Sequence, residues 1–330
     1  MKAAVYERYG PPEVVTVKEV AKPAIKDNEV LVKIRATTVS SGDWRARSLA
    51  VPAGFKLMSR LFFGVFRPRQ PILGTEFAGD VAAVGKDVTR FKVGDAVFGY
   101  PGAAFGCHAE YRAMPADGSI ALKPANLSYQ EAAALCFGGT TALDYLKDKG
   151  KIARGEKVLI VGASGTVGSA AVQLAKHFGA EVTAVCGPAN LALVKSIGAD
   201  HVIDYTKEDF TRSGRRYDVI LDMADDRSLP DRRRALTPNG TLIPNSGRGN
   251  RFLGSLGRII WARMASLVVS QSFRPFLSTQ NRDDLLALRR LLEDGSVRPI
   301  VGERHPLDDA AAAVTTAGGG HATGKVVIVV

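Results

Sequence analysis

The spacing of apolar and polar residues divides the chain into two kinds of region. Up to about residue 125, short segments of alternating polarity are separated by Gly and Pro, a pattern that predicts a compact β-rich domain. The strands predicted there span residues 3–7, 14–20, 29–37, 75–84 and 95–100. Further on, short apolar runs alternate with helical patterns, and strands are predicted at 158–161, 181–186, 201–204, 217–222 and 240–244. Alternating strands and helices predict an α/β fold with a parallel, doubly wound sheet.

The segment VLIVGASGTVGSAAVQLAK at 158–176 carries the clearest chemical signal. Its apolar run, glycines and helical periodicity predict a strand, a tight turn and a helix that begins near Thr166. We expect Gly162 to allow the turn, Gly165 to let backbone N–H groups approach a diphosphate, and Gly168 to permit close helix packing. Because Ala163 replaces the first glycine of the G-x-G-x-x-G pattern, an ordinary glycine-rich turn is the alternative. The residues expected to hold the diphosphate of a dinucleotide are Gly162, Ala163, Ser164, Gly165, Thr166, Val167 and Gly168.

The end of the second of these strands bears on which nicotinamide cofactor fits. NAD sites usually place Asp or Glu about 20 residues beyond the glycine motif, where the carboxylate would repel the 2′-phosphate of NADP. Here the strand ends at Cys186 and no acid follows until Asp200. Gly187 and Asn190 can offer N–H donors, so NADPH is favoured. Since no Arg directly follows the strand, a pocket that accepts either cofactor is the alternative.

Composition is that of an ordinary soluble protein. The 330 residues are 46% hydrophobic and 23% charged, and they leave room for two domains. Three cysteines without paired spacing indicate a reducing environment, and we expect a cytoplasmic protein. The opening MKAAVYERYG reads as a strand and not as a signal peptide. Since Arg258 and Arg263 interrupt the apolar region at 252–273, no membrane association is expected.

The net charge of +11 raises nucleic acid as a possible partner. The basic clusters lie at 67–69, 215–216 and 232–234. Because none of them is interleaved with aromatic residues that could stack on bases, a solvated surface that steers an anionic cofactor is favoured over nucleic-acid binding.

Several motifs together resemble the medium-chain dehydrogenase/reductase superfamily. They are PILGTEFAGDVAAVGKDVTRFKVGDAVFG at 71–99, GGTTALDYL at 138–146, the GASGTVG turn, GADHVIDY at 198–205, LLEDGSVRPIV at 291–301 and the closing GKVVIVV. Within the superfamily, the chain is similar to the zinc-independent quinone-oxidoreductase branch, which includes ζ-crystallin-like proteins. The resemblance implies a GroES-like catalytic domain formed by residues 1–125 and 280–330, around a Rossmann domain at 126–279 that binds NADP(H). It also implies an active site in the cleft between the domains and a homodimer.

The resemblance also bears on zinc. Zinc enzymes of the superfamily carry a Cys and a His at the positions of Ser40 and Thr75, and a catalytic zinc needs three N, O or S ligands. Cys136 alone cannot supply such a site, and the adjacent pair Cys107 and His108 points apart. No metal site is therefore expected. Without a Lewis acid, the chemistry must suit an activated acceptor, such as a quinone or an α,β-unsaturated carbonyl.

Candidate site residues follow from the resemblance combined with this chemistry. Ser40, Asp43 and Thr141 are the catalytic candidates, although Asp43 reads more readily as a carboxylate that fixes its loop, and Ser40 could equally cap that loop. Since no His is placed as a general acid, the final proton could come from solvent. The further cofactor contacts expected are Gly187, Asn190 and Tyr205 at the adenosine end and Asn245, Ser246 and Gly247 beside the nicotinamide.

The resulting hypothesis is an NADPH-dependent reductase of quinones or enones. The alternatives are an NADP-dependent alcohol or aldehyde dehydrogenase, and a non-catalytic protein that binds NADPH or RNA. An insertion at 53–71, AGFKLMSRLFFGVFRPRQP, is rich in Phe and Arg. We expect it to form a mobile lid that selects a bulky apolar acceptor, with a partner-binding or dimer helix as the alternative.

Overall fold

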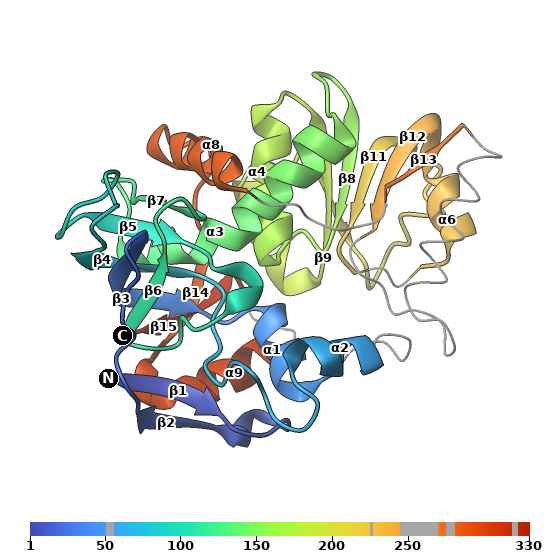
Figure 1. Cartoon of the computed structure of the whole chain (residues 1–330). Coiled ribbons are helices and arrows are strands. Elements are labelled where there is room, and N and C mark those ends of the chain that lie inside the picture. The colour runs from blue at the N-terminus through green and yellow to red at the C-terminus, as the bar shows by residue number, and fades with distance from the viewer. Residues whose placement is uncertain (51–55, 225–226, 245–269, 275–280, 319–322) are drawn as a thin grey trace.

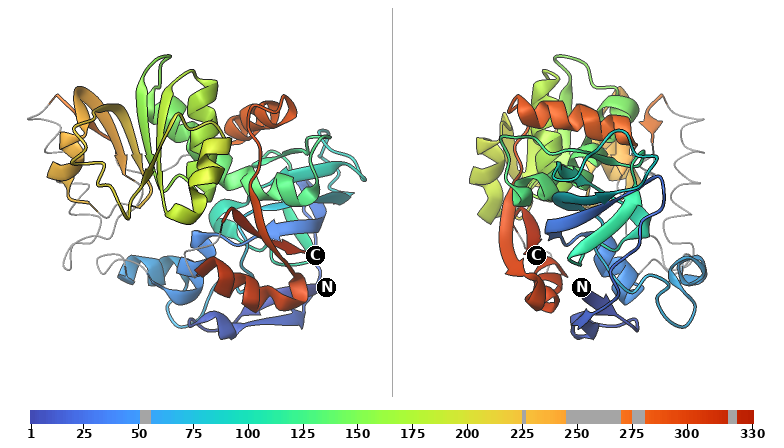
Figure 2. Two further views of the ribbon diagram at one scale, coloured as in Figure 1. Left: turned by 180° about the vertical axis from the view of Figure 1, so that it is seen from behind. Right: turned by 60° about the vertical axis from the view of Figure 1, so that its left-hand side comes forward.

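The computed structural model describes residues 1–50, 56–224, 227–244, 270–274, 281–318 and 323–330. These residues form two lobes, and both chain termini lie in the same lobe, close to each other (Figure 1). Figure 2 shows from behind and from the side that the last strands of the chain return to the lobe in which the chain begins.

The first lobe is built around a sheet in the order β14-β15-β3-β4-β5-β7, with β6 paired to β3. Its strands are β3 (Glu29–Thr38), β4 (Phe77–Val84), β5 (Ala96–Gly99), β6 (Tyr111–Pro115), β7 (Ile120–Leu122), β14 (Val301–Pro306) and β15 (Lys325–Val329). A separate antiparallel pair contains β1 (Lys2–Tyr6) and β2 (Val15–Glu19). Because β15 pairs antiparallel with β3, with Val327 opposite Thr38, the C-terminal segment completes the N-terminal sheet.

Among the described residues, the second lobe holds a six-stranded sheet, all of whose strand pairs are parallel. In spatial order its strands are β10 (His201–Asp204), β9 (Glu181–Cys186), β8 (Lys157–Val161), β11 (Tyr217–Asp222), β12 (Leu236–Pro244) and β13 (Ser272–Phe273). Numbered along the chain, this is the order 3-2-1-4-5-6 of a doubly wound dinucleotide-binding sheet, whose ligand crevice opens where the order reverses, between β8 and β11. The predicted parallel, doubly wound sheet is confirmed.

Helices flank both sheets. The α-helices are α1 (Ser41–Ser48), α2 (Lys56–Phe63), α3 (Tyr129–Leu143), α4 (Thr166–His177), α5 (Leu191–Ser196), α6 (Leu229–Arg234), α8 (Arg282–Glu293) and α9 (Ala310–Gly318). Short 3-10 turns occupy Pro12–Val14, Gly102–Ala104, Pro188–Asn190 and Leu307–Asp309, and a π-helical turn at Asp144–Gly150 continues α3. Helix α3 begins at a capping box, in which Ser128 and Glu131 each satisfy the other's backbone N–H.

Helix α3 holds the two lobes together. Its small residues, among them Ala132 and Ala133, are fully buried and belong to one apolar cluster. That cluster also contains Val327 of the first sheet and Ile160 of the second. Close packing continues at Gly138, where an added Cβ would lie 2.5 Å from Cγ2 of Thr166 at the start of α4. The core therefore runs through both lobes and sets how the glycine-rich turn faces the first lobe.

None of the helices in the described part of the chain is long and apolar enough to cross a bilayer. The apolar region at 252–273 lies largely outside the described residues.

Candidate active site

A cavity of about 310 Å³ opens between the two lobes at the end of β8. The second lobe contributes the glycine-rich turn and the start of α4, together with the residue that follows β11. The first lobe contributes the segment after β3 and the start of β15. The lining residues are Val39, Ser40, Ser41, Phe137, Gly138, Gly162, Gly165, Thr166, Val167, Gly168, Met223, Ala317, Gly324, Lys325 and Val326. The cavity thus lies at the crevice where ligands bind in doubly wound sheets.

The glycine-rich turn has the backbone geometry that its sequence predicts. Gly162 has a φ of +78°, which L side chains rarely adopt. A Cβ on Gly168 would lie 2.2 Å from the carbonyl oxygen of Gly162, whereas a Cβ on Gly165 would meet only that oxygen, at 3.5 Å. Gly168 is therefore required for packing within the protein, and Gly165 leaves open space.

The N terminus of α4 offers donors to that space. Gly165 is its N-cap residue, and no side chain caps the helix. The first-turn N–H groups, from Thr166 onward, have no partner within the helix and carry the positive end of the helix dipole. The turn therefore offers a diphosphate group hydrogen-bond donors, a positive helix dipole and enough open space.

The residues expected to contact the adenosine end of the cofactor lie near the end of β9. A Cβ on Gly187 would lie 3.3 Å from the hydroxyl of Tyr205, which is 56% exposed, and Asn190 accepts a 3.0 Å hydrogen bond from Thr323. The structure therefore brings Gly187, Asn190 and Tyr205 to one edge of the sheet. Thr323 extends this edge from the first lobe.

The acidic residues near β9 differ in where they point. Asp200, the first acid in sequence, binds Lys176 at 2.8 Å and the N–H of Val182, so its carboxylate lies at the opposite end of the strands. Asp204 stands opposite Cys186 in the register of β10 and β9, which the sequence pattern did not reveal. Its carboxylate accepts hydrogen bonds from the backbone and hydroxyl of Thr206, and these bonds lower its pKa.

Lys195 and Lys207, the two lysines nearest to this edge in sequence, also point in different directions. Lys195 donates to the carbonyl of Asp200 at 2.7 Å and is directed away from the end of β9. Lys207 is highly exposed and lies 4.0 Å from the Asp204 carboxylate. Of the two, Lys207 is therefore the cation at the adenosine edge.

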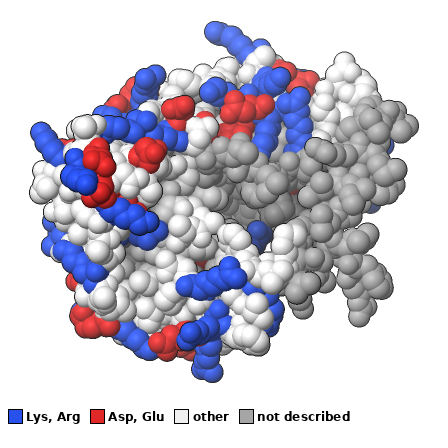
Figure 3. Space-filling view, viewed as in Figure 1, with Lys and Arg blue, Asp and Glu red and all other residues white. Residues whose placement is uncertain are grey.

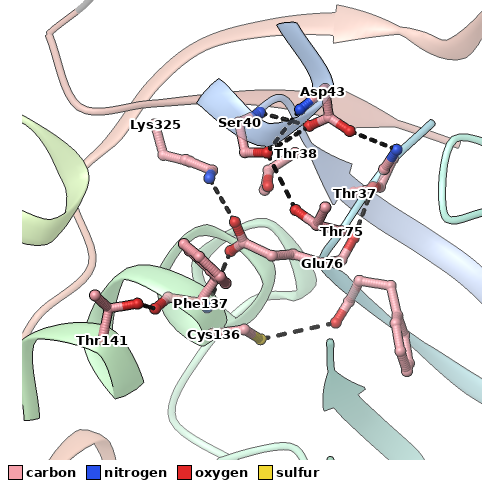
Figure 4. Close-up of polar contacts among 12 residues, drawn as sticks. Thr37, Thr38, Ser40, Asp43, Thr75, Glu76, Cys136, Phe137, Thr141 and Lys325 are labelled. Carbon is pink, nitrogen blue, oxygen red and sulfur yellow. Dashed lines mark hydrogen bonds and ion pairs between the residues drawn. The ribbon is translucent and has the colours of Figure 1, made fainter. Parts of the chain in front are cut away.

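Ser40 and Asp43 form a tight network at the start of α1 (Figure 4). One carboxylate oxygen of Asp43 accepts from the backbone and hydroxyl of Ser40, both at 2.7 Å, and the other accepts from the N–H of Gly74 at 2.7 Å. The hydroxyl of Thr75 donates to that of Ser40 at 3.2 Å. Asp43 is fully buried, whereas Ser40 lines the cavity. This geometry supports the loop-fixing interpretation of Asp43 and leaves Ser40 both as cap and as cavity contact.

The third catalytic candidate lies deeper in the protein. Thr141 is 2% exposed and donates to the carbonyl of Phe137 at 2.6 Å, one turn earlier in α3. Phe137 and Gly138 line the cavity, and Thr141 is not among the lining residues. Thr141 therefore supports the helix wall of the site.

A buried ion pair at the cavity was not recognised from the sequence. Lys325 of β15 donates to Glu76 at 2.5 Å, and the side chains are only 5% and 0% exposed (Figure 4). The other Glu76 oxygen accepts from the N–H of Phe137 at 3.3 Å. Burial raises the pKa of the Glu76 carboxyl, while Lys325 opposes that rise. A single Lys within the apolar run GKVVIVV was the available signal, because a buried charge requires a partner.

The cysteines occupy apolar surroundings. All three are buried, and burial raises the pKa of the Cys107, Cys136 and Cys186 thiols. His108 is fully buried, and its Nε2 lies 3.0 Å from the carbonyl oxygen of Thr38. Among the described residues, no three His, Cys, Asp or Glu side chains are grouped to hold a metal ion. The predicted contacts Asn245, Ser246 and Gly247 lie outside the described residues.

A doubly wound sheet facing a second, β-rich lobe that the C-terminal strands complete defines the class of two-domain, alcohol-dehydrogenase-like proteins. Two family models match the chain: "Alcohol dehydrogenase GroES-like domain" over residues 26–124 and "Zinc-binding dehydrogenase" over residues 197–328. The chain belongs to the medium-chain dehydrogenase/reductase superfamily and to its quinone-oxidoreductase-like branch. The predicted combination of GroES-like and Rossmann domains is confirmed.

Individual relatives agree with this placement. The chain is 34% identical to a 2-methylene-furan-3-one reductase of Solanum lycopersicum, over 99% of this chain and 79% of that protein. It is 31% identical to a chloroplastic NADPH-dependent alkenal/one oxidoreductase of Arabidopsis thaliana, over the same shares of each chain. The solved quinone oxidoreductase of Coxiella burnetii superposes with a TM-score of 0.86 at 28% identity, covering 100% of this chain and 99% of that one.

Proposed function

We propose that the protein is an NADPH-dependent reductase that transfers hydride to a quinone or to the β-carbon of an α,β-unsaturated carbonyl. The observation that carries the proposal is the cavity between the lobes, where the uncapped start of α4 faces Ser40 and Lys325. Relatives named as reductases or oxidoreductases of quinones and alkenals or enones support this acceptor class.

The chain's residues fit such a cofactor. The backbone from Ser164 to Val167 would hold the diphosphate, and Lys325, paired with Glu76, would lie on the opposite wall. Gly187, Asn190 and Tyr205 would contact the adenosine end, with Lys207 beside a 2′-phosphate. Asn245, Ser246 and Gly247 are proposed for the nicotinamide side. When bound, NADPH supplies the hydride.

The polar groups at the acceptor side suit a reaction without zinc. Ser40 and Thr75 present hydroxyls where zinc enzymes of the superfamily place ligands, and a hydroxyl is a weak ligand compared with thiolate or imidazole. Ser40 is proposed to contact the acceptor oxygen, Asp43 to hold Ser40 in place, and Thr141 to support the wall formed by Phe137 and Gly138. Solvent provides the final proton.

A stopped-flow panel tests the proposal. NADPH or NADH is mixed with quinones, enones, aldehydes and ketones, and metal is measured in the same sample. Quinones or enones should oxidise NADPH faster than NADH. Stoichiometric zinc, faster turnover with NADH, or selective reduction of simple aldehydes would each contradict one part of the proposal. Tight NADPH binding without turnover would favour a binding protein.

The domain division at 1–125 with 280–330 and at 126–279 remains a proposal, supported by the presence of β14 and β15 in the first sheet. A homodimer and a cytoplasmic location also remain proposals. Sedimentation velocity measures the oligomeric state directly.

A further inference from the structure

The segment between Asp43 and Glu76 has an unusual charge pattern. Residues 44–75 contain no Asp or Glu, and their basic residues are Arg45, Arg47, Lys56, Arg60, Arg67 and Arg69. The segment thus holds six positive charges of a chain whose net charge is +11. No acid within the segment neutralises this charge.

The same segment exposes most of the large apolar side chains found on the described surface. Six of the ten exposed large hydrophobic residues lie between Trp44 and Phe66. Five of them form a surface on and just after α2, with exposed fractions of 55% for Met58, 55% for Leu61, 57% for Phe62, 40% for Val65 and 93% for Phe66. We call this set the α2 surface. Met58, Leu61 and Phe62 follow the i, i+3, i+4 spacing of one helix face, and Val65 and Phe66 follow after the helix ends at Phe63.

The opposite side of α2 is anchored to the first lobe. Phe63 packs edge-on against Phe105, with ring centroids 6.1 Å apart, and Tyr9 donates to the carbonyl of Gly64 at 2.8 Å. The N–H of Arg69 donates to the carbonyl of Phe63 at 2.8 Å. The fold therefore presents the α2 surface outward from a fixed base.

Exposed arginines border the apolar side chains. Arg60, Arg67 and Arg69 are exposed and flank Phe62 and Phe66 in sequence. In Figure 3 the area over α1 and α2, at the lower right beside the grey atoms, is blue and white. An apolar helix face bordered by cations is the pattern of helices that lie in the interface of anionic membranes.

We propose that the α2 surface binds the face of a membrane rich in anionic lipids, with Phe62 and Phe66 entering the boundary between headgroups and acyl chains. A second copy of the chain is a poor occupant, because its equally basic α2 surface would be repelled. Nucleic acid would leave the aliphatic Met58, Leu61 and Val65 without an apolar environment. A bilayer satisfies both the apolar side chains and the arginines.

The location of this surface adds a consequence for the substrate. Phe63, on the inner side of α2, packs against the same apolar cluster as Val39 and Val326 of the cavity wall. An acceptor with a long apolar tail could therefore reach the cavity from the lipid side. This consequence rests on the proposed function, whereas membrane binding does not.

Vesicle flotation of the full-length protein with bound NADPH tests the proposal. The probes are vesicles of phosphatidylcholine alone and vesicles that also contain phosphatidylglycerol. The wild type should float with the anionic vesicles and remain largely unbound with the neutral ones. F62S/F66S and R67E/R69E should each weaken binding to the anionic vesicles by about tenfold or more.

Two variants serve as matched controls. R215E/R216E makes the same charge change at two exposed arginines of the second lobe, and V93S removes an apolar side chain that is 62% exposed elsewhere. Both should float like the wild type, and thermal unfolding checks that all variants are folded. Equal weakening by R67E/R69E and R215E/R216E would overturn the proposal, because it would indicate non-specific attraction.

Other results would assign the surface differently. Membrane binding would be overturned if the wild type did not float with either kind of vesicle. A difference in oligomeric state between the wild type and F62S/F66S would then assign the surface to a dimer contact, and salt-sensitive RNA retention by the wild type would assign it to RNA. If the wild type did not float and F62S/F66S lost turnover with a bulky water-soluble acceptor, the predicted lid would be favoured. Flotation by a protein that reduces no quinone or enone would contradict the proposed function and leave the membrane site standing.

Discussion

At the scale of single residues, the pair of Glu76 and Lys325 shows how two charged side chains can be buried beside the cavity. Both side chains are almost completely removed from water, and each satisfies the other. Replacing one partner of a buried pair is far more costly than replacing both, because a lone buried charge keeps its full desolvation cost. Lys325 therefore serves the stability of the first lobe through its pairing with Glu76.

Replacing Lys325 with Met should lower the free energy of unfolding by about 3–5 kcal/mol near pH 8. Burial already raises the pKa of Glu76, and removal of Lys325 should raise it further. An acid with a raised pKa in the folded state favours folding at low pH, where it is protonated, and loses that contribution as pH rises through the folded-state pKa. The loss should therefore shrink toward about pH 5, where Glu76 is more fully protonated. Urea unfolding at the two pH values measures both effects.

The double variant E76Q/K325M is the control for this prediction. It removes both charges, so it should recover much of the lost stability and show little difference between the two pH values. A K325M variant whose loss of stability is the same at both pH values would contradict a role for the Glu76 carboxylate.

At the scale of elements, each glycine of the turn between β8 and α4 has a different structural role. Sequence spacing predicted separate roles for Gly162, Gly165 and Gly168, and the space around each of them agrees with those roles. The network of Ser40 and Asp43 is an element-level feature of a different kind. Loop capping by Ser40 and loop fixing by Asp43 were predicted from residue types, but the partner Gly74 became apparent only when the loop before β4 was placed beside α1.

Two alanine substitutions in the turn should have different consequences. In Gly168→Ala the new Cβ would collide with the backbone of Gly162, so we expect a stability loss of about 1–3 kcal/mol together with weaker NADPH binding. In Gly165→Ala the Cβ would point into open space. Stability without cofactor should then change little, while the Kd for NADPH should rise about tenfold because a methyl group obstructs the approach to the diphosphate.

Thermal unfolding without ligand and fluorescence titration with NADPH separate the two effects. Equal destabilisation of the ligand-free protein by G165A and G168A would contradict the assigned roles. Unchanged NADPH affinity in G165A would place the diphosphate elsewhere.

At the scale of the whole molecule, the cavity combines residues from distant parts of the chain. The glycine-rich turn lies near the middle, Ser40 near the beginning and Lys325 near the end. A ligand that contacts all three binds only when both lobes are folded and correctly placed. Its binding energy therefore stabilises the two lobes together.

NADPH should stabilise the protein by about 2.7 kcal/mol when present at about a hundredfold excess over its Kd. Differential scanning calorimetry with and without NADPH measures the shift, and NADH at the same concentration should produce a smaller one. If NADPH raised the unfolding temperature of only part of the protein while another transition stayed in place, the cofactor would be held by one lobe alone.

Local residue order was sufficient to predict most strands of the second lobe, although β12 begins at Leu236, before the predicted 240, and β13 was not predicted. The strands at 201–204 and 217–222 and the start of α4 at Thr166 lie where the sequence places them, because apolar periodicity and glycine spacing are properties of neighbouring residues. The pairing of Glu76 with Lys325, the arrival of Asp204 beside Cys186 and the outward face of α2 were decided by tertiary structure. Each depends on which distant segments meet or fail to meet, and burial and charge pairing have no counterpart in a one-dimensional pattern.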